Sequence, residues 1–177
     1  MPARKMKPVF LVICEGQSEA TYVDFLRQTF RSPIKVITDV VGTSINKSLV
    51  ARKTNAIKLT PTDNVRVFLM YDMDVERINR KLDECSCVKA LSNPCFEVWY
   101  LLHSKGVVRS LDSNECIKKL KEAQPVWANY EKSKLTDSQK LFLKDNLESA
   151  IANAEQLKEG ANPSSMVYRL VKELMSN

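Results

Sequence analysis

The order of apolar runs and helical repeats in the first 71 residues constrains the fold most. Three segments have the character of strands: residues 9–14 are a continuous apolar run typical of a buried strand, residues 34–41 are rich in β-branched residues, and residues 65–71 form the third strand. A helical repeat at 18–30 and a polar, basic stretch at 45–57 separate them. Because parallel neighbours need a crossover connection, this order favours a parallel sheet. We predict an α/β fold in which a parallel sheet is flanked by helices.

The second half of the chain has mainly helical patterns. Thr136 and Gln139 form a capping box, which predicts one long helix that ends near Glu159. The Asn-Pro pairs at 93–94 and 162–163 have the form of an N-cap followed by a first-turn proline. We therefore expect a helix directly after each pair, and additional C-terminal helices beside the sheet.

Length and composition fit a single soluble domain. The chain has 177 residues, a length that is enough for a hydrophobic core and short for two domains. Of these residues 44% are apolar and 27% are charged, as in ordinary soluble globular proteins. We expect residues 8–91 to form the α/β core and residues 92–177 a mainly helical extension. The longest apolar run has six residues, far fewer than the roughly 20 of a membrane helix. The basic start lacks a signal-peptide core, so we expect a cytoplasmic protein without membrane association.

The five cysteines and the single histidine limit thiol and zinc chemistry. An odd number of cysteines without framework-like spacing fits reduced thiols. A structural zinc site usually needs four good ligands, and a Cys–His catalytic pair has no supporting motif here. Both kinds of site are therefore disfavoured.

The net charge of +6 is concentrated in the first third of the chain. Residues 1–60 contain 10 Lys and Arg against 4 Asp and Glu, whereas residues 61–177 contain 17 of each kind. Two interpretations fit this asymmetry: a solvated surface that keeps the protein soluble, or electrostatic attraction of a polyanion such as DNA or RNA.

Acidic residues follow two of the predicted strands. Glu15 comes directly after the first strand, and Asp72 and Asp74 come after the third. Because the carboxyl ends of parallel strands face a shared crevice, we expect these carboxylates to meet there. An extended backbone would point both aspartates the same way, with Met73 turned into the core. Clustered carboxylates repel unless a cation offsets their charge, and Mg²⁺ (or Mn²⁺) suits such a site because it also accepts phosphate oxygens.

Each of these acids also has a simpler explanation. An isolated Asp-x-Asp is common in exposed turns, and Gly16 after Glu15 could end the strand by supplying a positive φ. Glu19 could be a first-turn acid that favours the dipole of a helix capped by Ser18. Glu97 near the start of an apolar helix has the same dipole explanation, or it is a buried acid that lines the crevice.

Four motifs occur together along the chain. They are Cys14-Glu15-Gly16-Gln17-Ser18-Glu19 with Tyr22; Asp72-Met73-Asp74; Ser92-Asn93-Pro94-Cys95-Phe96-Glu97-Val98-Trp99 with Leu101-Leu102-His103; and Ala161-Asn162-Pro163-Ser164-Ser165. In this combination, from about residue 8 to residue 175, the chain resembles the RloB-like proteins of bacteria, which include the AbiLii type. The resemblance implies a Toprim-like (Rossmann-like) fold. It also implies a place in restriction and phage-defence loci beside an AAA-type ATPase, RloA.

The resemblance further implies roles for particular residues. Glu15 would be the general acid/base of phosphodiester cleavage, and Asp72 and Asp74 would hold Mg²⁺. Glu19 would complete the metal site or support it. The other candidate site residues are Gly16, Ser18, Asn93 and Glu97. Toprim loops often carry more glycine than this chain, which has four in all.

The implied function is that of a Mg²⁺-dependent nuclease. It would cut DNA or RNA, including tRNA, as the toxic effector of an abortive-infection system, and the AAA-type ATPase would restrain or trigger it. The alternative is a non-catalytic subunit that keeps the Toprim shape and binds nucleic acid or the ATPase. The oligomeric state, including a homodimer, stays open.

Overall fold

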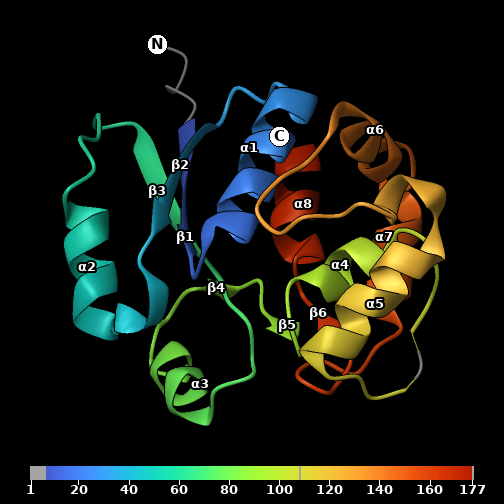
Figure 1. Cartoon of the computed structure of the whole chain (residues 1–177). Helices are drawn as coiled ribbons and strands as arrows, with labels where there is room; N and C mark the ends of the chain where they lie inside the picture. The colour runs from blue at the N-terminus through green and yellow to red at the C-terminus, as the bar shows by residue number, and fades with distance from the viewer. Residues whose placement is uncertain (1–6, 108, 177) are drawn as a thin grey trace.

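A parallel sheet forms the centre of the protein (Figure 1). The computed structural model describes residues 7–107 and 109–176, and within them four strands lie side by side in the order β2-β1-β3-β4. The strands are β1 (Lys7–Cys14), β2 (Lys35–Val40), β3 (Asp63–Met70) and the short β4 (Val88–Lys89). All pairings between them are parallel, so the predicted fold class is confirmed: an α/β, Rossmann-like fold.

The register of β1 places the ends of two strands at the same level. Cys14, the last residue of β1, pairs with Val40 of β2 on one side and with Met70 of β3 on the other. The segments that follow β1 and β3 therefore leave the sheet next to each other. The backbone continues this pairing, since the amide of Glu15 donates to the carbonyl of Met70 at 3.0 Å.

Each face of the sheet has its own hydrophobic core. Phe10, Val12 and Cys14 of β1 belong to the core that includes α1 (Gln17–Phe30). Leu11 and Ile13 point the other way, into a core shared with α2 (Lys47–Asn55) and α3 (Glu76–Asp83). A short 3₁₀ turn, η1 (Gly42–Ser44), precedes α2. Since β1 is covered on both faces, its continuous apolar sequence is the pattern expected of a buried parallel strand.

The C-terminal helices extend the core on the α1 side of the sheet (Figure 1). They are α4 (Glu97–Leu102), α5 (Ser113–Ala123), η2 (Pro125–Trp127), α6 (Asp137–Asp145), α7 (Leu147–Glu155) and α8 (Tyr168–Met175). A small antiparallel pair, β5 (Ser92–Asn93) with β6 (Ser164–Ser165), ties the start of this region to its end. In the described part of the chain, no helix has the length and apolar character needed to span a membrane.

The single long helix predicted from Thr136 to Glu159 is wrong. The capping box is present, but the helix breaks at Asn146, where φ is −110° and ψ is 14°. The Asn146 side chain donates to the carbonyl of Phe142 at 2.9 Å. An asparagine that bonds a nearby carbonyl in this way competes with the helical backbone, which accounts for the boundary between α6 and α7.

The two Asn-Pro pairs do not start helices either. Asn93 lies in β5 and its side chain donates to the carbonyl of Gly160 at 3.1 Å. The Asn162 side chain bonds both the amide and the carbonyl of Leu111, at 3.0 and 2.7 Å. Both Asn–Pro peptide bonds are cis. The N-cap predictions were wrong because these side chains satisfy distant loop backbone rather than the nearest helix end.

Candidate functional site

The ends of β1 and β3 meet through the side chain of Glu15. Its Oε2 accepts a hydrogen bond from the backbone amide of Asp72 at 2.9 Å. The structure thus brings together the two strand ends that the sequence placed at one edge. Burial raises the pKa of Glu15, the bond from Asp72 lowers it in part, and the charge of Asp74 raises it further.

Asp72 is the most strongly perturbed acid of this edge. Among the described residues, its Oδ1 is buried and has no hydrogen-bond partner. Burial raises the pKa of Asp72 to about 9, and the charges of Glu19, Glu15 and Glu97 contribute in the same direction. A buried carboxyl oxygen without a partner costs about 1–3 kcal/mol, so this oxygen is available for a ligand that the protein itself does not supply.

Glu19 is buried, with an exposed fraction of only 5%. Its Oε2 accepts a hydrogen bond from the amide of Gly16 at 3.1 Å, so Gly16 and not Ser18 is the N-cap of α1. Burial raises the pKa of Glu19, and the charges of Glu15 and Glu97 add to this effect. Glu19 is therefore both a helix-start acid and a member of a set of coupled carboxylates, Glu15, Glu19, Asp72 and Glu97, named here the acidic group.

The structure corrects the sequence explanation of Gly16. Its φ is −140°, an extended value that any residue adopts, so a positive φ is not needed here. The close neighbour is the carboxylate of Glu19, whose Oε2 lies 3.4 Å from the position that a Cβ on Gly16 would take.

Asp72 and Asp74 differ in their surroundings. Met73 between them packs against the core on the α2 side, and its amide donates to the carbonyl of Ser92 at 2.8 Å. Asp74 is exposed, and its charge raises the pKa of Glu15. The two aspartates are therefore not equivalent: Asp72 is largely enclosed and Asp74 faces solvent.

Glu97 belongs to the same acidic group. It is 1% exposed and lies in the first turn of α4, so it is at once a helix-start acid and a buried acid. The Tyr130 hydroxyl donates to Glu97 Oε1 at 3.1 Å, and the Lys132 ammonium lies 3.7 Å from the same oxygen. The charge of Glu97 raises the pKa of Glu19 and Asp72, which links it to the strand ends.

Tyr130 and Lys132 are contacts that the sequence did not predict. A carboxylate between aromatic residues has to find a donor or a cation if it is buried, so a partner for Glu97 was to be expected. Tyr130 is 33 positions away along the chain, however, and no local pattern indicates which loop supplies the partner.

Ser18 and Asn93 contact distant loops. The Ser18 hydroxyl accepts a hydrogen bond from the amide of Ser133 at 3.2 Å, and Asn93 holds Gly160 as described above. Both side chains fix loops near the acidic group, and neither contacts one of its carboxylates through a hydrogen bond in the described part of the chain.

The acidic group fits a hard divalent cation only as an open site. Within the described residues, no three His, Cys, Asp or Glu side chains are arranged as a ready metal cage. Mg²⁺ does not require one, because it binds through one or two carboxylates and keeps waters and phosphate oxygens as its other ligands. The unpartnered Asp72 Oδ1 and the raised pKa values of its neighbours fit this mode of binding.

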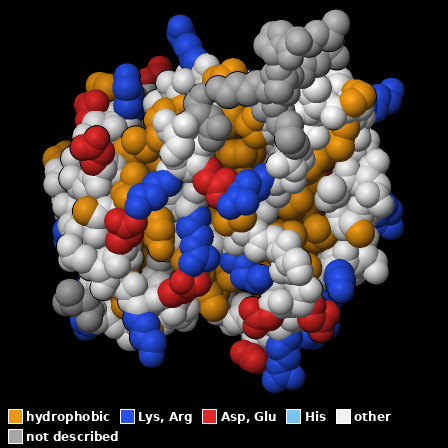
Figure 2. Space-filling view, turned by 180° about the vertical axis from the view of Figure 1, so that it is seen from behind, with side chains coloured by type: hydrophobic (Ala, Val, Ile, Leu, Met, Phe, Trp, Pro, Cys, Tyr) orange, Lys and Arg blue, Asp and Glu red, His pale blue; other side chains and the backbone are white. Residues whose placement is uncertain are grey.

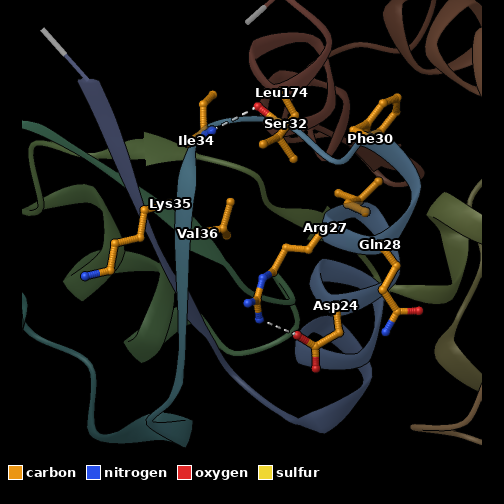
Figure 3. A pocket seen from close by; sticks show the side chains of 10 residues that line it. Asp24, Arg27, Gln28, Phe30, Ser32, Ile34, Lys35, Val36 and Leu174 are labelled. Atoms are coloured by element: carbon orange, nitrogen blue, oxygen red, sulfur yellow. Dashed lines mark hydrogen bonds and ion pairs between the residues drawn. The ribbon is translucent and has the colours of Figure 1, made fainter.

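A separate pocket lies between α1, β2 and α8 (Figure 3). It has a volume of about 410 Å³, and Asp24 inside it is paired with Arg27 at 3.1 Å. Among its described lining residues are none of the predicted site residues. This pocket is therefore not the place where the carboxylates gather.

The face of the molecule in Figure 2 carries basic and acidic side chains interspersed. Ion pairs of this mixed kind join α8 to other segments: Arg169 pairs with Glu159 at 2.6 Å, and Lys172 pairs with Glu155. Such pairing neutralises local charge, so the polyanion interpretation of the net charge stays a prediction.

These observations define a class of protein, the Rossmann-like α/β proteins whose parallel sheet carries coupled carboxylates at its carboxyl edge. The model of one family, described as RloB-like protein, matches residues 10–174. The chain therefore belongs to the RloB-like protein family. Comparison with curated proteins and with solved structures found no match.

Proposed function

We propose that this protein is a Mg²⁺-dependent (or Mn²⁺-dependent) nuclease that cleaves phosphodiester bonds in DNA or RNA. The observation that carries the proposal is the buried, unpartnered Oδ1 of Asp72 within a group of electrostatically coupled carboxylates. Structural carboxylates normally have partners, and strongly raised pKa values in such a group are typical of functional sites.

The proposal assigns proton transfer to Glu15. Burial and the charge of Asp74 raise the pKa of Glu15, so it takes up a proton nearer to neutral pH than an ordinary glutamate does. The hydrogen bond from the Asp72 amide fixes its carboxylate at the strand end. Glu15 can therefore remove a proton from an attacking group or return one to a leaving group.

Asp72 and Asp74 would hold the metal ion, with Glu19 beside them. The enclosed Asp72 offers its unpartnered oxygen, and the exposed Asp74 is accessible to a substrate. When bound, Mg²⁺ supplies an activated water and stabilises the charge that develops on the phosphate.

We further propose that the nuclease is the toxic effector of a phage-defence system, with tRNA among its candidate substrates. An AAA-type ATPase of the RloA kind would restrain or trigger it. Membership of the RloB-like family supports this proposal.

A non-catalytic binding subunit is the second candidate. The lack of a ready three-ligand metal cage among the described residues favours it. Such a protein would dock to the ATPase or to nucleic acid through the same edge of the sheet, and its carboxylates would be dispensable for chemistry.

Growth arrest on expression separates the two candidates. The chain is expressed with and without the partner ATPase as wild type, Glu15→Ala and Asp72→Asn. Asp24→Asn is the matched control, since Asp24 is an exposed α1 carboxylate that is paired with Arg27. We expect wild type and the control to stop growth or protect against phage, and both site variants to lose the effect. Site variants as toxic or as protective as wild type would contradict the nuclease.

A further inference from the structure

A loop of the C-terminal half lies across the first turn of α1. Residues 130–135, named here the strap, run beside α1 as the orange loop in Figure 1. Ser133 joins the two segments: its amide donates to Ser18 Oγ at 3.2 Å, and its carbonyl accepts from Thr21 Oγ1 at 3.2 Å. The Ser18 and Ser133 hydroxyls are also 3.3 Å apart.

The backbone of the strap is held in an unfavourable conformation at this point. Ser133 has a φ of 63°, in the left-handed region, which costs about 1–2 kcal/mol for a residue other than glycine. Such a conformation persists when the surroundings determine it, and it occurs often at functional sites. The contacts to Ser18 and Thr21 are the interactions that hold it.

The strap carries Tyr130 and Lys132 to the acidic group. Tyr130 is buried and donates to Glu97, whereas the Lys132 side chain is 58% exposed. Within the described residues, Lys132 is the one cation within 4.0 Å of a carboxylate of Glu15, Glu19, Asp72 or Glu97. It is therefore the cation placed to contact a polyanion that binds at these carboxylates.

The contact with Glu97 leaves the Lys132 ammonium with hydrogen-bond donors for another anion. Its Nζ lies 3.7 Å from Glu97 Oε1, longer than the roughly 2.7–2.9 Å of a charge-assisted hydrogen bond. Tyr130 already supplies a hydrogen bond to the same oxygen. An ammonium has three donors, so Lys132 can bind a second anion without leaving Glu97 unpartnered.

We propose that Lys132 binds a phosphate oxygen of the nucleic acid at the acidic group, and that the strap positions it there. The inference rests on the proposed nuclease function. It names the residue whose positive charge would offset the repulsion between the nucleic acid and the carboxylates of the site. Contacts to phosphate fix the register of a nucleic acid on a protein, which is the task expected of this lysine.

Lys134 offers a matched control. It lies two residues further along the same strap, its side chain is 72% exposed, and it is paired with Glu131 rather than with the acidic group. Lys132→Arg is a second comparison, since it keeps a positive charge beside Glu97. It separates loss of the charge from loss of the lysine side chain itself.

Binding is measured by fluorescence anisotropy on labelled tRNA and duplex DNA without divalent metal, over a range of salt concentrations. We expect Lys132→Ala to weaken binding to both and to reduce the log–log salt slope by about 1, with Lys132→Arg restoring it. Lys134→Ala should keep the wild-type slope. A Lys132→Ala slope equal to that of Lys134→Ala, or no binding by wild type, overturns the inference.

A cleavage assay of the same variants keeps this proposal apart from the proposed function. With Mg²⁺ present, we expect Lys132→Ala to raise KM more than it lowers kcat. If wild type binds as predicted but cuts nothing, the nuclease fails and the phosphate contact stands. If wild type cuts and Lys132→Ala has an unchanged KM and salt slope, the phosphate contact fails and the nuclease stands.

Discussion

At the scale of single residues, the acids of this edge divide by burial. Asp72 is enclosed and has an unpartnered oxygen, Glu15 is tied to the Asp72 amide, and Asp74 is exposed. A sequence motif does not reveal this division, because Asp72 and Asp74 look alike in Asp-Met-Asp. The enclosed aspartate is the one whose protonation should depend most on the fold.

Asp72 should make the stability of the metal-free protein depend on pH. Burial raises its pKa from 3.8 to about 9, so between these values the folded protein holds a proton that the unfolded chain has released. This stabilisation is complete below the lower value and is lost as pH rises toward the upper one. Asp72→Asn cannot titrate, so its free energy of unfolding relative to wild type should rise with pH, by on the order of 1–3 kcal/mol.

Urea denaturation of both proteins with a chelator, at several pH values between about 5 and 9, measures this difference. Asp24→Asn is the control, since Asp24 lies in the pocket of Figure 3 away from the acidic group. If the free energies of unfolding of wild type and Asp72→Asn differ by the same amount at every pH in this range, Asp72 ionises normally.

At the scale of elements, the strap explains why a serine stands at position 18. Ser18 accepts a hydrogen bond from the Ser133 amide, while Gly16 caps α1. Ser18→Ala should therefore cost about 1 kcal/mol and loosen the strap. Hydrogen exchange checks this outcome: the Ser133 amide should lose protection, and the Thr21 amide in the first turn of α1 should keep it. Loss of protection at Thr21 alone would restore Ser18 as a helix cap.

Elements with a self-contained pattern could be predicted from the sequence. The runs 9–14 and 65–71 are strands within two residues of their observed ends. Residues 9–14 and the last three residues of β3 are buried, and a buried strand has to be apolar there. The roles of Asn93 and Asn162 in the two Asn-Pro segments could not be predicted from the local sequence. Asn93 and Asn162 bond Gly160 and Leu111, and only the folded chain brings these partners to them.

In the candidate site, too, some contacts could be predicted from the sequence and others depend on distant parts of the folded chain. That Glu15 and Asp72 meet follows from topology, since the ends of adjacent parallel strands share an edge. The contacts of Glu97 with Tyr130 and Lys132 depend on the path of the strap, which no periodicity encodes. The sequence therefore predicts the acids at the strand ends, Glu15 and Asp72, but it does not predict which loop residues contact Glu97.

At the scale of the whole molecule, the C-terminal helices complete the acidic edge. They share one core with α1, and they bring Glu97 on α4 and Lys132 on the strap to the ends of β1 and β3. The sheet alone would leave a smaller and more open acidic edge. The function we propose therefore belongs to the sheet and the helical region together.

The most direct test of the account is cleavage of tRNA, single-stranded DNA and duplex DNA by the purified chain. With Mg²⁺ or Mn²⁺ we expect cleavage of at least one substrate by wild type and Asp24→Asn, and none with a chelator. Glu15→Ala should lose about 10²–10⁴-fold in rate, the range that a general acid or base contributes. Cleavage by Glu15→Ala at the wild-type rate, or metal-independent cleavage, would contradict the assignment of the chemistry to these strand ends.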